Sequence, residues 1–216
     1  MTHQAERRAT RTDRLLRRTT TAADEPATAA GQQAPLPVGT AAVAVARCAA
    51  TTATLLAGRR IHLPRGRVGL RLRFADGTSS SVYRETVVDR PAPADPCVLV
   101  VSFRLRAVRG YGHALFRWES LLNTPLFVGF PGFVSKLWLA HDEHGAYRGF
   151  YEWDDPALAE AYAGALWRVL ALVSVPGSIA HRVLPGMRRD DVLADPGLGA
   201  VPPGTTSEWW RLTGVG

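Results

Sequence analysis

Alternating apolar and polar positions identify the clearest strand of the chain, CVLVVSFRLR at 97–106, which follows a proline-rich stretch at 90–96. Side chains two positions apart lie on the same face of a strand, so this segment has two distinct faces. One face carries Cys97, Leu99, Val101, Phe103 and Leu105, and the other carries Val98, Val100, Ser102, Arg104 and Arg106. Apolar residues then recur at helical spacing over about 110–124, which predicts a helix that ends at Pro125.

Two aromatic-rich runs at about 133–140 and 146–153 predict a β-hairpin, because the short polar loop HDEHG separates them. Asp155 and Pro156 then suit the N-cap and the first position of a helix with apolar residues at helical spacing. The run SIAHRVL predicts the last strand. The resulting order, βαββαβ, is the ferredoxin-like arrangement, so the predicted fold class is α+β.

The N-terminal part predicts a basic β-hairpin that extends this domain. The segment RVGLRLRF at 67–74 alternates until Asp76-Gly77, a dipeptide suited to a tight turn, and SSSVYRETVV returns as the second strand. The small apolar residues at 41–57 are compatible with either a weak strand or an Ala-rich helix. The predicted segments are a disordered tail at 1–39, a hairpin extension and linker at 40–96, the α+β domain at 97–187, and a C-terminal tail at 188–216.

One face of the predicted sheet is left uncovered, because both helices of a ferredoxin-like domain lie on the same side. We expect Val98, Val100, Trp138 and Phe150 on that face, and an apolar surface of this kind is usually hidden from water. Pairing two such sheets across a two-fold axis forms a dimeric α+β barrel and encloses a cavity. The sequence thus predicts a homodimer with a pocket for a small hydrophobic or aromatic molecule.

The register of the aromatic hairpin decides which side chains line that pocket. With a five-residue loop at 141–145, uninterrupted alternation points Lys136 and Trp138 into the barrel. On the second strand the inward residues are then Arg148, Phe150 and Glu152. A slip by one residue exchanges the faces of the second strand and brings Tyr151 and Trp153 inward instead.

Three stretches of this domain carry a family resemblance: PGFVSKLWL, the Gly-aromatic-Glu strand in GFYEWDD, and the Ala/Tyr-rich helix ALAEAYAGAL. Over about residues 97–186 the chain resembles the YdhR-like mono-oxygenase family of the dimeric α+β barrel superfamily. That superfamily includes cofactor-independent oxygenases of phenolic polyketides, haem-degrading enzymes, isomerases and binding proteins, so the fold constrains function weakly. In the cofactor-free oxygenases the substrate supplies the electrons, after deprotonation to an enolate or phenolate.

The resemblance implies a base, a group that stabilises the substrate anion, and apolar walls. The catalytic candidates are His113 as the base, Arg104 and Lys136 as anion stabilisers, and Glu152 as the alternative base or as a partner that orients a cation. The substrate-binding candidates are Trp138, Phe150, Arg148 and Trp118. Lys136 and Glu152 alternatively form a cross-strand ion pair, and His113 alternatively is a surface or capping residue. We expect no metal and no cofactor.

Charge and cysteine content limit the remaining alternatives. The net charge of +7 arises within residues 1–96, and the arginine-rich segment at 59–73 fits a solvated strand face or, alternatively, a surface for an anionic ligand or a partner. It lacks interleaved aromatic residues, so we do not expect nucleic-acid binding. Two distant cysteines indicate neither a zinc site nor a disulfide framework. With no signal peptide and no apolar stretch of about 20 residues, we expect a cytoplasmic protein without a membrane span.

Three functions remain open at this stage. The leading one is a small-molecule enzyme of secondary metabolism that resembles cofactor-independent mono-oxygenases or cyclases and acts on an aromatic or enolisable, polyketide-like substrate. The alternative is a non-catalytic module of the same fold that binds a hydrophobic ligand or a partner. Haem binding, with His113 or His181 as the axial ligand, is the third, although His181 is better explained as a core-facing, hydrogen-bonded residue.

Overall fold

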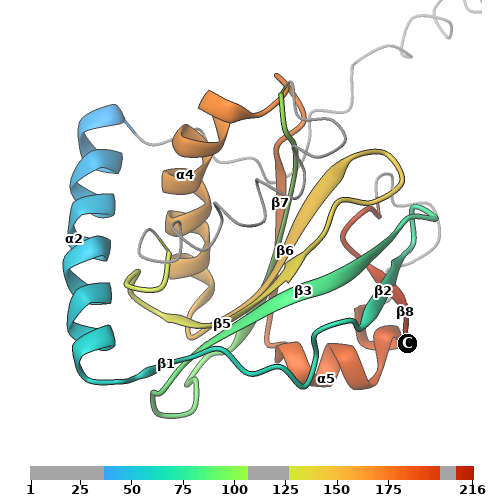
Figure 1. The fold of residues 1–216 in the computed structure, drawn as a ribbon, viewed down its shortest axis with the longest axis horizontal. Helices are drawn as coiled ribbons and strands as arrows, with labels where there is room; N and C mark the ends of the chain where they lie inside the picture. The colour runs from blue at the N-terminus through green and yellow to red at the C-terminus, as the bar shows by residue number, and fades with distance from the viewer. Residues whose placement is uncertain (1–36, 107–126, 200–207) are drawn as a thin grey trace, which may run out of the picture. The chain divides into compact units, whose positions relative to one another are not determined.

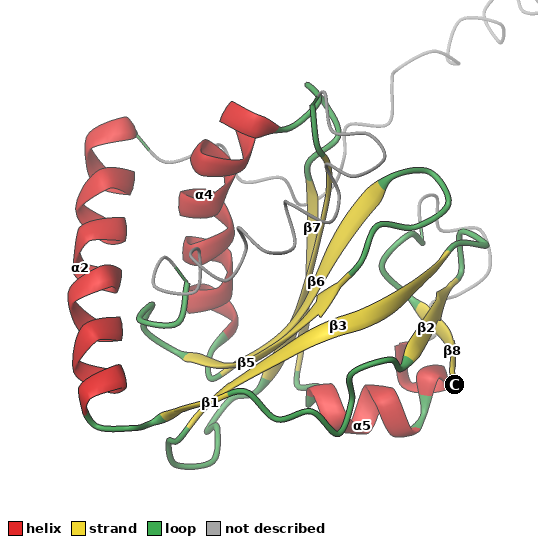
Figure 2. Cartoon of the chain, viewed as in Figure 1, coloured by secondary structure: helices red, strands yellow, loops and turns green. Residues whose placement is uncertain are grey.

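The computed structural model describes residues 37–106, 127–199 and 208–216. Its helices and strands are shown in Figures 1 and 2. In chain order they are α2 (Val38–Ala57), β1 (Ile61–His62), β2 (Arg71–Phe74), β3 (Ser79–Val88), β4 (Cys97–Arg104), β5 (Phe133–Leu139), β6 (Ala146–Trp153), α4 (Pro156–Val173), β7 (Ala180–Pro185), α5 (Arg189–Ala194), the 3₁₀ helix η2 (Pro196–Gly199) and β8 (Leu212–Val215).

The strands form one antiparallel sheet in the order β7-β4-β6-β5-β3-β2-β8, with β1 paired to the end of β3. The part β7-β4-β6-β5 has the strand order of a ferredoxin-like domain, which confirms the predicted α+β class. The predicted N-terminal hairpin is β2 and β3, and β3 continues the same sheet beside β5. The helix predicted over 110–124 lies outside the described residues.

Helices α2 and α4 lie on one side of the sheet (Figure 1). Of the two conformations that the sequence allows for 41–57, the structure shows the helix, because α2 includes the whole segment. Helix α4 begins as predicted, because the Asp155 side chain accepts hydrogen bonds from the backbone N–H groups of Ala157 (2.7 Å) and Leu158 (3.0 Å). The core on this side joins residues of the sheet to residues of α4. Its buried members include Cys97, Leu99, Val101, Tyr151, Trp153, Tyr162 and Leu166.

Helix α2 makes a close backbone contact with the turn at 127–130. A Cβ atom added to Gly129 would lie 2.0 Å from the carbonyl oxygen of Cys48, so only glycine fits there. By length and composition alone, α2 and α4 could each cross a membrane, although core helices of soluble proteins pass the same test.

The opposite face of the sheet differs from the sequence-based prediction, because the C-terminal segment covers it. Val98, Val100 and Phe150 do lie on this face, but they pack against Val192 of α5 and against other residues near the C-terminus. Those C-terminal partners also include Trp210 and Leu212. The described parts of residues 188–216, for which the sequence predicted only a tail, thus contribute to a second core. Val98 and Val100 are fully buried within one chain, so an exposed apolar sheet face no longer supports a homodimer. The homodimer stays a prediction.

The register of the β5–β6 hairpin also differs from the predicted one. Phe133 pairs with Trp153 as predicted, but a β-bulge between Phe133 and Ser135 shifts every later pair, so that Lys136 lies opposite Tyr151. The extra residue exchanges the two faces of β5, whereas the faces of β6 are as predicted. Lys136 and Trp138 consequently lie on the helix side of the sheet, and their predicted position in an open barrel is wrong.

Candidate functional site

The predicted site residues do not form one cluster, because the sheet separates them. Arg148, Phe150 and Glu152 lie on the face of β6 that the C-terminal segment covers, and Lys136 and Trp138 lie on the other face. The alternative cross-strand ion pair between Lys136 and Glu152 is therefore also wrong. Arg104 is exposed at the end of β4, away from Lys136. His113 and Trp118 lie outside the described residues.

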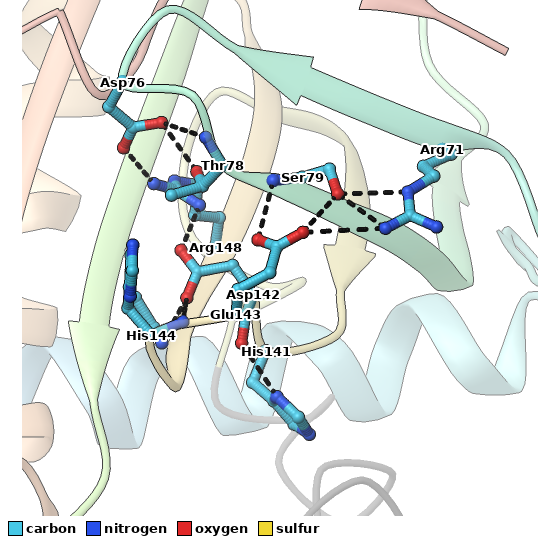
Figure 3. Close-up of polar contacts among 10 residues, drawn as sticks. Arg71, Asp76, Thr78, Ser79, His141, Asp142, Glu143, His144 and Arg148 are labelled. Carbon is cyan, nitrogen blue, oxygen red and sulfur yellow. Dashed lines mark hydrogen bonds and ion pairs between the residues drawn. The ribbon is translucent and has the colours of Figure 1, made fainter.

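Arg148 joins two hairpin turns rather than lining an open pocket (Figure 3). Its buried guanidinium donates to Asp142 Oδ2 (2.7 Å) and Asp76 Oδ2 (2.6 Å), and its Cζ lies 4.3 Å from the centroid of the Phe74 ring. Asp76 in turn accepts from the backbone N–H (3.0 Å) and the hydroxyl (2.6 Å) of Thr78. These contacts give Arg148 a structural role.

The loop between β5 and β6 is held by hydrogen bonds of the same kind. The Asp142 side chain accepts from the backbone N–H groups of His144 (2.9 Å) and Ala146 (2.9 Å), and Glu143 accepts from the Ser79 hydroxyl (2.6 Å; Figure 3). No group of three or more His, Cys, Asp or Glu side chains in the described part of the chain is arranged to hold a metal ion. His181 is the hydrogen-bonded core histidine that the sequence predicts, with its Nε2 2.8 Å from Glu160 Oε2.

Glu152 belongs to a charged cluster at the start of α5. Burial raises the pKa of Glu152, and the nearby Arg189 charge partly offsets this increase in pKa. The neighbouring Glu85 is buried and forms ion pairs with Arg67 (2.9 Å) and Arg189 (2.8 Å). Each acid in this cluster therefore lies close to an arginine.

Lys136 has a different environment, because aromatic rings surround its ammonium group. Its Nζ lies 3.2 Å from the ring centroid of Trp138, 4.6 Å from that of Tyr151 and 4.8 Å from that of Phe127. Within the described residues, no hydrogen bond or ion pair involves this group. Only 5% of the residue is exposed. Burial, and then the charge of Arg84, holds the pKa of Lys136 well below its ordinary value.

Arg84 is the second cation of this site, and sequence reasoning did not single it out. It lies opposite Trp138 in the β3–β5 pair, next to a β-bulge between Val82 and Arg84. Its Cζ lies 3.8 Å from the Trp138 ring centroid, and burial lowers its pKa. The sequence predicted β3 as a strand, but it did not predict the bulge in β3 or the pairing of β3 with β5.

The rings around the two cations are held by hydrogen bonds and by ring contacts. The Trp138 Nε1–H donates to Thr86 Oγ1 (3.0 Å), and the Tyr162 hydroxyl donates to the Tyr151 hydroxyl oxygen (3.2 Å). Burial raises the pKa of both tyrosines, so they remain protonated at neutral pH. We call Lys136, Arg84 and the rings of Phe127, Trp138 and Tyr151 the cation–aromatic site.

A surface groove of about 440 Å³ reaches Arg84 from the solvent side. Its lining residues are Leu63, Pro64, Arg65, Val68, Tyr83, Arg84 and Glu85. The Tyr83 ring lies 6.5 Å from the Trp138 ring, so the groove borders the cation–aromatic site. By contrast, the cavity between α2 and α4, lined by Phe127 and Tyr162 among others, measures about 10 Å³, which is about the size of one water.

No family model and no curated protein sequence matches the chain. Among solved structures it is similar to an anthrone oxidase-like protein, with 13% identity and a TM-score of 0.33, over 52% of this chain and 58% of that one. It is also similar to a major regulator of staphylococcal pathogenesis, with 12% identity and a TM-score of 0.37, over 60% of this chain and 98% of that one.

A third similar structure is an uncharacterized ferredoxin fold protein, related to antibiotic biosynthesis monooxygenases, from Listeria monocytogenes 4b F2365. It has 12% identity and a TM-score of 0.37, over 63% of this chain and 88% of that one. The chain thus spans only 58% of the length of the anthrone oxidase-like protein. These TM-scores are low, so the fold class rests on the strand order, and the YdhR-like resemblance stays a prediction.

Proposed function

We propose that the chain is a small-molecule enzyme of the cofactor-independent mono-oxygenase or cyclase kind, acting on an aromatic or enolisable, polyketide-like substrate. The observation that supports this is the cation–aromatic site, where two buried cations lie against the Trp138 ring. A substrate that is planar and becomes anionic matches both properties of this site. The rings stack on its apolar body, and the cations stabilise its negative charge.

Lys136 takes the role of the base in this proposal, in place of the anion-stabilising role expected from the sequence. Burial lowers the pKa of Lys136, so its amine becomes neutral more readily than that of an exposed lysine and can then accept a proton from an acidic C–H or O–H group. Arg84 keeps its proton and stabilises the enolate or phenolate that results. The electron-rich anion then reacts with dioxygen, which is the oxidant of the oxygenases that the sequence resembles.

Oxygen uptake with 1,8-dihydroxyanthrone, an enolisable tricyclic ketone, tests this proposal. The wild-type chain should consume oxygen above the spontaneous rate, and Lys136→Met should lower kcat by about 10²–10⁴-fold, the usual contribution of a general base. Arg59→Ala, at an exposed position outside the site, is the control and should leave the rate unchanged. Equal rates for wild type and Lys136→Met would refute the role of Lys136.

The alternative function, a non-catalytic binding module, is favoured by one observation. The cavity between α2 and α4, which Phe127 and Tyr162 help to line, measures about 10 Å³ and is too small for a tricyclic molecule. A ligand would then occupy the groove beside Arg84. Quenching of tryptophan fluorescence by the anthrone, without oxygen uptake, would support this alternative over the enzyme.

A further inference from the structure

Lys136 is the only lysine among the 26 Lys and Arg residues of the chain. Lysine is normally a surface residue, yet this one is buried among aromatic rings. The other members of this set are all arginines. An arginine side chain does not lose its proton in proteins, whereas a lysine side chain can. The position therefore combines burial with the one basic side chain that can become a neutral amine.

Two other buried cations, Arg148 and Arg189, provide a comparison within the same structure. Arg148 pairs with Asp76 and Asp142, and Arg189 pairs with Glu85. In the described part of the chain, Lys136 has no carboxylate partner, and its ammonium group lies against the faces of three rings. A structural role as an ion-pair partner is thus excluded for Lys136 within this part, while its amine stays available for chemistry.

We propose that Lys136 is a nucleophile that forms an imine with the carbonyl group of an oxo compound, whose anionic group Arg84 binds. This rests on the proposed function, because it uses the same site and names its substrate class: carbonyl compounds with an acidic neighbouring C–H and a negative charge. The proximity of Arg84 supports it, since a desolvated lysine next to another cation is an established type of amine nucleophile.

The step is balanced without an oxidant or reductant. The neutral amine attacks the carbonyl carbon, a C–N bond forms, and the carbinolamine loses water as the C–O bond breaks. The imine nitrogen then takes up one proton. The iminium group acidifies the neighbouring C–H, and transfer of that proton to water gives an enamine, which is electron-rich like the enolate of the proposed oxygenase reaction. Lys136 acts here as the nucleophile and not as the base.

The groove beside Arg84 offers a route from solvent to the Lys136 amine. Arg84 lines the groove and also lies over the Trp138 ring that contacts Lys136. An anion in the groove would attract the guanidinium away from the ring, which opens the path to Nζ by a rotamer change of one side chain. A charged oxo compound should for this reason react faster than an uncharged ketone.

Reductive trapping tests the proposal with the full chain at pH 7. The protein is incubated with sodium cyanoborohydride and either acetoacetate or acetone, and adducts are located by intact-mass and peptide mass spectrometry. Besides reaction at the N-terminal amine, we expect an adduct at Lys136, formed at least about tenfold faster than with Nα-acetyl-lysine amide, because an ordinary lysine is almost entirely protonated at this pH. Lys136→Met should lose this adduct and retain only reaction at the N-terminal amine.

Arg84→Gln distinguishes anion binding from general reactivity. It should slow trapping by acetoacetate by about tenfold more than trapping by acetone, since only acetoacetate carries the charge that Arg84 would bind. Folding of each variant is checked by circular dichroism. A folded wild-type chain that gives no Lys136 adduct with either compound overturns the proposal.

Oxygen uptake is measured on the same preparations, so the two proposals can fail separately. Uptake without an adduct leaves the oxygenase function and removes the imine. An adduct without uptake of oxygen by the anthrone supports the nucleophile and removes the oxygenase.

Discussion

Replacing Lys136 by methionine measures what the buried amine does to stability. Methionine keeps an apolar stem of similar volume and removes only the ionisable group. In the wild-type chain the ammonium gains cation–π attraction from three rings, worth about 0.5–2 kcal/mol each. Taking an ion out of water costs several kcal/mol, and the Arg84 charge adds repulsion. The lowered pKa of Lys136 means that these costs exceed the attraction.

The sign of the pH dependence follows from proton binding. The pKa of Lys136 is lowered in the folded chain and is about 10.4 in the unfolded chain, so the unfolded chain binds one more proton between these two values. The free energy of unfolding of the wild type therefore rises with pH in this window, by about 1.4 kcal/mol per pH unit. Lys136→Met removes this dependence. The variant should be more stable than the wild type at pH 7. The difference in the free energy of unfolding between variant and wild type should decrease by about 1.4 kcal/mol for each pH unit within this window.

Urea unfolding at pH 7, 8 and 9, followed by tryptophan fluorescence, gives the stability difference directly. Comparing variants at each pH cancels the contribution of the other titrating groups. Lys136→Arg is the matched control, because its charge persists at all three pH values, and it should fall further behind the wild type as the pH rises. A wild type that is more stable than Lys136→Met, with a gap independent of pH, would refute the reasoning.

Three further predictions concern the two cores. Arg148→Met should lower the free energy of unfolding by about 3–5 kcal/mol, measured in urea, because buried Asp142 loses its partner; a loss below about 1 kcal/mol would contradict this. Gly129→Ala should cost about 1–3 kcal/mol in the same assay, and Gly66→Ala, with open space around it, should cost less. Val100→Glu should unfold the chain, because Val100 is fully buried. If sedimentation instead shows that the wild type is a dimer and the variant a folded monomer, this face is a dimer interface.

The sequence was most informative where apolar alternation is uninterrupted. The two faces of β4 and the cap at Asp155 follow directly from residue order, and both are confirmed. These features depend on local geometry, which a single segment determines. The ferredoxin-like strand order followed from them, because few topologies connect such elements.

The sequence was least informative where one extra residue or a distant segment decides the outcome. The bulge beside Val134 exchanges the faces of β5, and nothing in FVSKLWL marks it, because both faces of this strand carry apolar residues. Covering of the second face by Trp210 and Leu212 depends on contacts across most of the chain. The pairing of Arg84 with Trp138 depends on two irregular strands, so the cation–aromatic site could not be found from spacing.

The most direct test of the cation–aromatic site is an NMR titration of Lys136 itself. Because the chain has one lysine, labelling lysine with ¹³C at Cε gives a single side-chain resonance that reports the charge of this amine. We predict a titration with a midpoint well below the ordinary lysine value of about 10.4, and a higher midpoint in Arg84→Gln, which lacks the like charge. An ordinary midpoint near 10.4 in the folded wild type would contradict the role of Lys136 as a base and as a nucleophile.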